Sequence, residues 1–392
     1  MLENKMNSIE WLKQLIAFDT TSRLSNLPLI ECLANRFADL NIPTELIHDK
    51  TQPKANLLAT LPAKNGSRTG GIILSGHTDV VPVDGQSWDS DPFIATLKAD
   101  RIYCRGACDM KGYLAVVMSL LPQFKALALD FPIHFAFSYD EEVGCTGVLS
   151  LIDNLVAKDY QPRACLVGEP TAMKPVIGHK GKYTYRCQVH GVAAHSSLTN
   201  QGCNAIEHGA SLIHYLRTLA NAYKNQGIQD SDFDVPYTTL TTNLIKGGNA
   251  QNTIPNFCEF IFEFRNLPQD DSFKLHQQIV DYVNKDLLAD LHSDSLKASV
   301  NLEVISKAPG LNIAIDDPLV QAAQQISQVS HFTKVAYATE AGLFQQAGVP
   351  TIVCGPGHID QAHRANEYVA IAQLNQCEQF IRDLLSASFL RQ

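Results

Sequence analysis

Acidic and histidine residues recur just beyond apolar, strand-like runs of this 392-residue chain. These positions are His77, Asp109, Glu141, Glu142, Glu169 and His363. For example, His77 follows the apolar run 71–74, and the two glutamates follow the apolar run 133–139. In an open α/β sheet, ligands bind at the carboxyl ends of the strands. Such side chains converging on one edge of a sheet could hold metal ions that assist hydrolysis.

The segment 75–79 places an acid, Asp79, two residues after His77. An imidazole at a strand end is a good zinc ligand, and the acid can accept the proton of the other ring nitrogen and fix the tautomer. A His-x-Asp pair taken alone is more often structural. Asp109, just before the apolar segment 112–124, could equally cap a helix, because Asp is a favoured cap.

Adjacent carboxylates stand at Glu141 and Glu142. An acidic pair after a strand is usually a solvated turn, but here the chain continues into Val-Gly-Cys-Thr-Gly instead of a polar loop. A metal hydrolase needs two such acids, since one can bind the metal while the other moves a proton. The pair therefore indicates hydrolytic chemistry when it is taken together with the other strand-end residues.

The elements that would position these residues alternate between strand and helix up to about residue 180. Residues 8–42 show helical spacing of apolar side chains, and 112–124 is apolar nearly all round, which indicates a buried helix. A helix over 316–330 and a strand over 351–354 continue this alternation after Pro309. The pattern predicts an α/β fold with a mostly parallel sheet covered by helices.

A different pattern interrupts this alternation. Its expected elements are a strand at 183–190, a helix at 202–223, strands at 237–246 and 257–265, a helix at 270–288 and a strand at 298–306. The order β-α-β-β-α-β is that of a ferredoxin-like sandwich. We therefore predict a discontinuous catalytic domain, 1–182 and 308–392, with an inserted α+β domain, 183–307.

Composition excludes several classes of function. The net charge is −9 and no basic stripe is present, so nucleic-acid binding is disfavoured. We find neither the apolar core of a signal peptide nor a run long enough to span a membrane, and expect a soluble, cytoplasmic protein without a membrane partner. The ten cysteines form no C-x-x-C pair and are expected to be reduced core residues, although Cys104 and Cys108 could suggest a thiolate metal site.

Five motifs resemble the M20 metallopeptidase/deacylase family, and together they span nearly the whole chain. They are Gly76-His-Thr-Asp-Val-Val-Pro82, Arg105-Gly-Ala-Cys-Asp-Met-Lys-Gly112, Asp140-Glu-Glu-Val-Gly144, Gly191-Val-Ala-Ala-His-Ser-Ser197 and Gly247-Gly-Asn-Ala-Gln-Asn-Thr-Ile-Pro255. The resemblance implies a homodimeric amide hydrolase with two Zn²⁺ ions per subunit. Co²⁺ or Mn²⁺ could substitute, because carboxylate and imidazole ligands suit them too.

The resemblance also implies a role for each matching residue. One zinc ion would be held by His77 and Glu169, the second by Glu142 and His363, and Asp109 would bridge both. The catalytic residues would be Asp79, which orients His77, Glu141 as general base, and His195, which reaches the partner subunit's active site from the inserted dimerisation (lid) domain. Substrate would be bound by Arg265, Asn252 and Glu340, although Glu340 could instead be an acid at a helix start.

The segments 167–171, 337–341 and 355–363 resemble the family members that release acetate from N2-acetyl-L-ornithine, a reaction of arginine biosynthesis. Alternatives are desuccinylation of succinyl-diaminopimelate, deacylation of another N-acyl amino acid, or a catalytically silent metal-binding protein. The sequence departs from the usual pattern at Cys108, where these enzymes often carry a small residue. A thiol there could perturb the metal site, or it could be an inert buried side chain.

Overall fold

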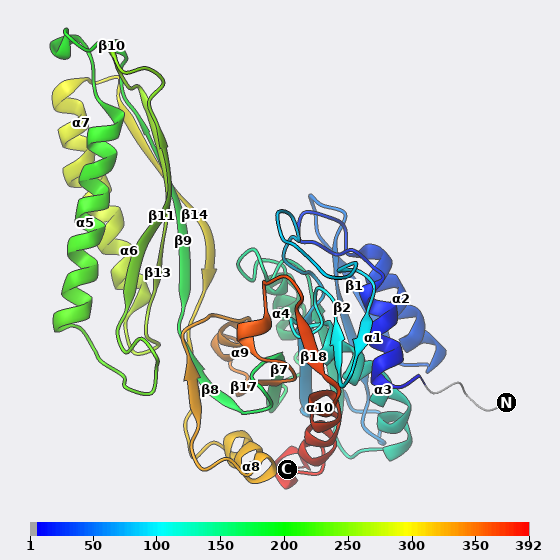
Figure 1. Ribbon diagram of the computed structural model, residues 1–392. Coiled ribbons are helices and arrows are strands. Elements are labelled where there is room, and N and C mark those ends of the chain that lie inside the picture. Colours follow the sequence, from blue (N-terminus) through cyan, green and yellow to red (C-terminus); the bar gives the residue numbers. More distant parts are fainter. Residues whose placement is uncertain (1–5, 392) are drawn as a thin grey trace. The chain divides into compact units, whose positions relative to one another are not determined.

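The computed structural model describes residues 6–391, and the chain forms two compact units (Figure 1). The larger unit contains Met1–Gly178, Leu311–Lys334 and Thr339–Gln392. The smaller unit contains His179–Gly310 and the short segment Val335–Ala338. The sequence placed the inserted domain at 183–307, and did not anticipate that residues 335–338 join it.

The larger unit is built on a nine-stranded sheet. Its strands, in spatial order, are β1 (Thr44–His48), β2 (Ala55–Leu61), β6 (Ile133–Ser138), β3 (Ile72–His77), β7 (Ala164–Pro170), β17 (Thr351–Gly355), β8 (Val176–His179) and β15 (Leu311–Asn312), with β16 (Thr333–Val335) pairing with β8. The four central strands β6, β3, β7 and β17 are parallel. The prediction of a mostly parallel α/β sheet is therefore confirmed.

Every residue of the central strands β3, β6, β7 and β17 is buried. Such burial on both faces explains their continuous apolar runs, since helices cover both sides of a parallel sheet. The helices of this unit are α1 (Ser8–Ile16), α2 (Leu27–Asp39), α3 (Lys111–Leu127), α4 (Val148–Ala157), α8 (Pro318–Ser327), α9 (Ala341–Gln346) and α10 (Ile371–Leu384). A small antiparallel sheet joins β18 (Tyr368–Ala370), β5 (Arg101–Tyr103) and β4 (Thr96–Lys98), and short 3₁₀ turns span Ile359–Gln361 and Ser388–Arg391.

The helical prediction for 8–42 was too continuous, because two helices, α1 and α2, are separated by residues 17–26. Asp19 ends the first helical region with a local turn, accepting hydrogen bonds from the backbone N–H and the hydroxyl of Thr21. Asp and Thr favour such turns over helix interiors because their side chains compete for backbone groups. The turn carries Ser22 to the edge of the sheet, where its hydroxyl donates to Asp79 Oδ2 at 2.7 Å.

The smaller unit has the β-α-β-β-α-β order that the sequence predicted. Its elements are β9 (Lys182–His190), α5 (Ala205–Gln226), β11 (Thr239–Gly247), β13 (Phe257–Arg265), α6 (Ser272–Asp281), a π-helical turn (Tyr282–Leu287), α7 (Leu288–Asp294) and β14 (Ser299–Ala308). The antiparallel sheet has the strand order β11-β13-β9-β14, which is the ferredoxin-like arrangement. Beyond it, β10 (Ala194–His195) pairs with β12 (Thr253–Ile254), and a 3₁₀ turn spans Thr199–Gln201.

Aromatic side chains fill the core of the smaller unit. Phe260, Phe262 and Phe264 alternate along β13, so all three point toward the helices, and each is buried. The ring of Tyr185, on the adjacent β9, stacks on Phe262 with centroids 4.9 Å apart. These side chains give the unit its own hydrophobic core, with helices α5 and α6 covering one face of the sheet.

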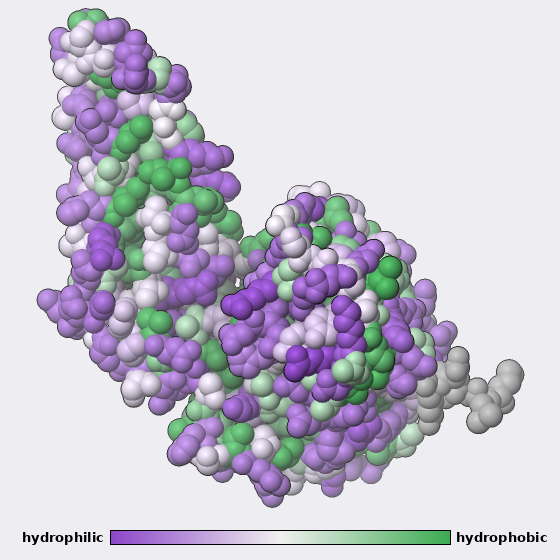
Figure 2. Space-filling view, viewed as in Figure 1, coloured by the Kyte–Doolittle hydropathy of each residue, from purple (hydrophilic) through white to green (hydrophobic). Residues whose placement is uncertain are grey.

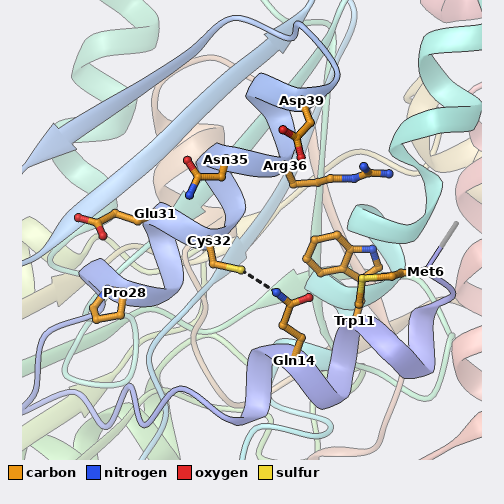
Figure 3. A pocket seen from close by; sticks show the side chains of 9 residues that line it. All are labelled: Met6, Trp11, Gln14, Pro28, Glu31, Cys32, Asn35, Arg36 and Asp39. Atoms are coloured by element: carbon orange, nitrogen blue, oxygen red, sulfur yellow. Dashed lines mark hydrogen bonds between the residues drawn. The ribbon is translucent and has the colours of Figure 1, made fainter. Parts of the chain in front are cut away.

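A surface hollow lies between α1 and α2 (Figure 3). Gln14 lies at its centre and donates to Cys32 Sγ at 3.1 Å. None of the predicted site residues lines this hollow. Within residues 6–391, no helix is both long and apolar enough to cross a membrane.

Candidate metal centre

The strand-end residues meet at one edge of the larger unit's sheet. His77 is the last residue of β3, Glu169 lies near the end of β7, and the two acids Glu141 and Glu142 follow β6. These three strands are neighbours and run parallel, so their carboxyl ends share one edge. Asp109 joins them from the turn before α3, and His363 from the loop after β17. We call this set the strand-end cluster.

Asp109 lies between the two histidines of the strand-end cluster. Its Oδ1 is 3.0 Å from His77 Nε2, and its Oδ2 is 3.2 Å from His363 Nε2. Each oxygen therefore faces a different imidazole. Glu169 Oε1 lies 3.6 Å from His77 Nε2, whereas Glu142 Oε2 lies 2.9 Å from His363 Nε2. The arrangement divides the cluster into two halves that share one carboxylate.

The tautomer of His77 follows from its contacts. Its Nδ1 lies 2.9 Å from the backbone carbonyl oxygen of Asp79 and must donate to it. In a neutral ring, the lone pair of Nε2 then faces the carboxylates of Asp109 and Glu169. A lone pair that faces two carboxylates requires a positive charge between them, either a proton or a metal ion. Without a metal ion, hydrogen bonds to Asp109 and Asp79 outweigh burial and raise the pKa of His77 well above its ordinary value.

Burial lowers the pKa of a histidine but raises the pKa of the acids in this cluster. Desolvation, together with repulsion from neighbouring carboxylates, raises the pKa of Glu141 to about 8 and that of Glu142 to about 7. The pKa of Glu169 is raised well above its usual range for the same reasons. Burial also opposes ionisation of Asp109, but its hydrogen bonds to His363 and His77 hold its pKa below the ordinary value. A concentrated positive charge among these groups would favour all of their ionised forms.

Asp79 organises the turn that carries the two glutamates. Its Oδ1 accepts the backbone N–H of Glu141 at 3.1 Å, and its Oδ2 accepts that of Glu142 at 3.3 Å. The same carboxylate lies 3.6 Å from His77 Nδ1 and accepts the hydroxyl of Ser22. Asp79 therefore fixes residues on two neighbouring strand ends at once.

Sequence reasoning missed a second set of supporting residues. Glu367 is buried, and its Oε1 accepts the backbone N–H groups of Cys108 and Asp109 at 3.0 and 3.2 Å. Its Oε2 pairs with buried Arg105 at 2.6 Å. The guanidinium also donates to Gln86, whose side-chain amide donates to the backbone oxygen of His363. The sequence signal was available, since Glu367 lies four residues after His363 in the same polar segment.

Cys108 is fully buried beside Asp109, and burial raises the pKa of its thiol well above the ordinary value. Its Cβ packs against Gly357, where an added Cβ would lie only 2.2 Å away. The thiol thus fills a close contact between two loops and stays protonated. Cys104 is buried as well, so the pair offers no exposed thiolate.

The residues of the strand-end cluster fit divalent metal ions. Their side chains offer two imidazole nitrogens and several carboxylate oxygens, and Glu142 Oε1 is buried without a hydrogen-bond partner among the described residues. Two groups of three residues bring their donor atoms within 4.8 Å of one another. One group is His77, Glu141 and Glu169, and the other is His77, Asp109 and Glu142. A ligand set of nitrogen and oxygen suits zinc and related divalent ions. Glu141 therefore lies beside the donor atoms of His77 and Glu169.

The structure places three further predicted residues, His195, Asn252 and Arg265, in the smaller unit. His195 ends β10 and is exposed, and its Nδ1 lies 2.8 Å from Ser197 Oγ. Asn252 is exposed in the turn before β12, and its backbone oxygen accepts the N–H of Ser196. The segments that carry His195 and Asn252 are thus hydrogen-bonded to each other. Arg265 ends β13, where its Nε donates to Glu263 at 2.8 Å.

Glu340, expected to bind substrate, has no exposed surface. One carboxylate oxygen accepts the hydroxyl of Ser75 at 2.6 Å, and the other accepts that of Ser138 at 2.7 Å. It also stands at the N-terminus of α9, which is the alternative that the sequence left open. Its observed contacts link α9 to β3 and β6 beneath the cluster.

The sequence profile of peptidase family M20/M25/M40 matches residues 73–387, which include every element of the strand-end cluster. The chain belongs to this family. An acetylornithine deacetylase of Proteus mirabilis (strain HI4320) is 33% identical over 385 residues, covering 96% of this chain and 95% of the relative. The family match and this relative make the chain an enzyme, a hydrolase of a metal-dependent family.

Solved structures share the M20 fold at low sequence identity. An M20 family metallo-carboxypeptidase from Sulfolobus solfataricus superposes with a TM-score of 0.74 at 18% identity, covering 97% of this chain and 99% of the other. A dinuclear metal binding peptidase of the same family from Bacillus subtilis gives a TM-score of 0.65 at 14% identity, covering 96% of both chains. These likenesses establish the common fold of the two M20 units.

Proposed function

We propose that this enzyme hydrolyses the amide bond of N2-acetyl-L-ornithine, releasing acetate and ornithine, with two zinc ions in the strand-end cluster. The observation that carries the proposal is the position of Asp109, which presents one oxygen to each of two histidines. His77 and Glu169 would hold one ion, and Glu142 and His363 the other. The name of the Proteus mirabilis relative supports the choice of substrate. The reaction would serve arginine biosynthesis in the cytoplasm.

Bound zinc ions supply Lewis acidity, since they lower the pKa of water and polarise a carbonyl. The protein's own contribution is the transfer of a proton. Glu141 is partly buried beside the proposed ligands, and the positive charge of bound ions would keep its carboxylate ionised, as a general base must be. Glu141 would take the proton from the attacking water and return it to the departing amine. The thiol of Cys145 donates to Glu141 Oε1 at 3.2 Å, which leaves the other oxygen for this transfer.

His195 would stabilise the negative charge that develops on the amide oxygen, acting on the partner subunit's active site in a homodimer. Two features of the smaller unit support the proposed homodimer. The strand β11 forms an edge of the smaller unit's sheet and exposes Leu244 and Ile245, at 66% and 56%. An open apolar edge is a natural surface for pairing with a second copy. Figure 2 shows hydrophobic side chains gathered on the visible face of this unit.

Arg265 and Asn252 would bind the amino-acid part of the substrate. A guanidinium can pair with an α-carboxylate through two parallel hydrogen bonds. Arg265 donates to Glu263 through Nε and to the backbone oxygen of Ala336 through Nη1, so Nη2 and the second N–H of Nη1 would serve the substrate. Asn252, exposed in its turn, would contribute its side-chain amide.

The test is a comparison of kcat/KM for N2-acetyl-L-ornithine, N-succinyl-diaminopimelate and other N-acyl amino acids on zinc-loaded protein. We expect acetylornithine to be the best substrate. A higher kcat/KM for the succinylated compound would replace the proposal by the desuccinylase alternative. Failure to hydrolyse any of them, with both zinc ions bound, would favour a catalytically silent metal-binding protein.

A further inference from the structure

Four side chains of the smaller unit form a second cluster that the proposed reaction does not use. Cys203 lies two residues before α5, and His208 lies in the first turns of that helix. Asp290 and Asp294 lie on α7, which packs beside the start of α5 (Figure 1). We call these four residues the helix-pair cluster. No described residue of the strand-end cluster belongs to this unit.

His208 is buried, and both of its ring nitrogens face carboxylates. Nδ1 lies 3.1 Å from Asp290 Oδ2, and Nε2 lies 2.9 Å from Asp294 Oδ2. A neutral imidazole carries one N–H and one lone pair, so only one nitrogen can donate. The other nitrogen then presents its lone pair to a carboxylate oxygen, a contact that a bound cation would make favourable.

The position of Cys203 indicates that this cation is a metal ion. It is buried at 1% exposure, and its Sγ lies 3.9 Å from the backbone oxygen of Leu291 on α7, so the thiol points at the other helix. Donor atoms of Cys203, His208 and Asp294 all lie within 4.8 Å of one another. In a tetrahedral zinc site such atoms lie roughly 3.4 to 3.6 Å apart, as the usual bond lengths require. To complete the site, His208 Nε2 and Asp294 Oδ2, which are 2.9 Å apart, would separate slightly, and Cys203 Sγ would move toward them.

The backbone around the helix-pair cluster is built to hold these positions. Asp290 and Asp294 are four residues apart, so they share one face of α7, where two like charges destabilise a helix unless a cation lies beside them. Buried Leu291 fixes that face, and the π-helical turn before α7 sets its rotation. Such π-helical turns are frequent at functional sites.

We propose that the helix-pair cluster binds a zinc ion through Cys203 Sγ, His208 Nε2 and an oxygen of Asp294. Asp290 would accept the proton of His208 Nδ1 and fix the tautomer, as carboxylates do around zinc-bound histidines. Asp294 is half exposed, so a water molecule can take the fourth position. The ion would cross-link the start of α5 to α7.

The site would also brace the segment that carries His195. The backbones of Val192 and Cys203 exchange two hydrogen bonds, of 3.0 and 2.9 Å, which close the base of this segment. An ion held by Cys203 would attach that base to both helices. The proposed position of His195 in catalysis would then depend on an ion that does not itself take part in the reaction.

The decisive experiment uses cobalt, which reports thiolate ligation through a ligand-to-metal charge-transfer band in the near ultraviolet. The full-length protein would be stripped with a chelator, reloaded with Co²⁺ and compared with Cys203→Ser. The matched control is Cys187→Ser, another buried cysteine of the same unit. We expect the band in the wild type and the control, and its loss in Cys203→Ser. Elemental analysis should show one zinc per chain fewer in Cys203→Ser than in the control.

If Cys203→Ser does not fold, replacing either of the two exposed acids, Asp290 or Asp294, still tests the proposal. Asp290→Asn should weaken cobalt binding about 10- to 100-fold while the thiolate band remains, which is the usual effect of losing an outer carboxylate. Asp294→Asn should lose the band at the same cobalt concentration, whereas Asp286→Asn, on the preceding turn, should not. A wild type without a thiolate band, or a band that persists in Cys203→Ser, would overturn the proposal. The contacts of His208 with Asp290 and Asp294 would then only join α5 to α7.

Discussion

The strand-end cluster and the helix-pair cluster both place a histidine among carboxylates, but different backbone elements hold them. In both, a histidine ring nitrogen faces carboxylate oxygens, an arrangement that a bound cation would stabilise. The strand-end residues sit on adjacent parallel strands, and Asp79 and Glu367 hold the surrounding backbone. In the helix-pair cluster, the two acids are half exposed or more and depend on how α5 and α7 pack. The first cluster is preorganised for chemistry, whereas the second is suited to respond to an ion.

The largest effect is expected from Glu141→Gln. If Glu141 is the general base, kcat should fall about 10²–10⁴-fold while both zinc ions stay bound. Steady-state kinetics and elemental analysis of the same preparation would check both statements. Loss of one zinc ion would instead make Glu141 a ligand, as its distance from His77 and Glu169 allows.

His195→Ala should lower kcat about 10²–10³-fold with zinc occupancy unchanged, as expected for the loss of one donor to a developing oxyanion. His214→Ala, an exposed histidine on α5, is the matched control and should keep normal activity. If His195 acts on the partner subunit, mixing inactive His195→Ala and Glu141→Gln subunits should restore activity, because the heterodimer has one site with both groups. Heterodimers that stay inactive would place His195 in its own subunit's site.

A third prediction concerns acid stability. His134 Nε2 donates to the backbone oxygen of Gly70 at 3.1 Å, and the hydroxyl of Thr60 lies 3.1 Å from Nδ1. Burial outweighs the bond to Gly70 and lowers the pKa of His134 from 6.5 to about 4. The folded chain therefore takes up this proton only at a lower pH than the unfolded chain does. Its contribution to stability is complete above pH 6.5 and is lost as the pH falls toward 4, by about 3 kcal/mol in total.

Denaturant titrations of the wild type and His134→Gln between pH 4 and pH 7 would measure this contribution. The free energy of unfolding should fall less steeply with acid in the variant. His179 is the counterpart at the start of the smaller unit, since burial lowers its pKa to about 4 as well. Equal slopes in the wild type and His134→Gln would show that His134 is not neutral in the folded protein.

The smallest effect is expected from Ser22→Ala. The hydroxyl of Ser22 donates to Asp79, which in turn holds His77 and the backbone of the two glutamates. Losing this outer hydrogen bond should weaken zinc binding about tenfold, which competition with a chelator can measure. The control is Ser25→Ala, because that hydroxyl donates to the backbone oxygen of Pro53 instead. An unchanged zinc affinity would mean that Asp79 keeps its position without Ser22.

The sequence predicted the parallel sheet and the ferredoxin-like order because strand and helix periods differ along the chain. It also predicted which strand ends carry acids and histidines. It could not reveal Ser22 or Arg105 as supporting residues, since their contacts bridge positions that are far apart in the sequence. Glu340 illustrates the limit most clearly. An acid before a short helix has the same sequence whether it faces a substrate or two buried serine hydroxyls.

Residues Val335–Ala338 have a consequence for how the chain is made. They belong to the smaller unit, where the backbone oxygen of Val335 accepts the N–H of Lys180. A ribosome must therefore add residues up to 338 before the unit that starts at His179 is complete, a few seconds after Gly310 at roughly 5–20 residues per second. The larger unit then still awaits β17, the neighbour of the strand that bears Glu169. The unit that begins later in the sequence is thus the one whose synthesis is finished first.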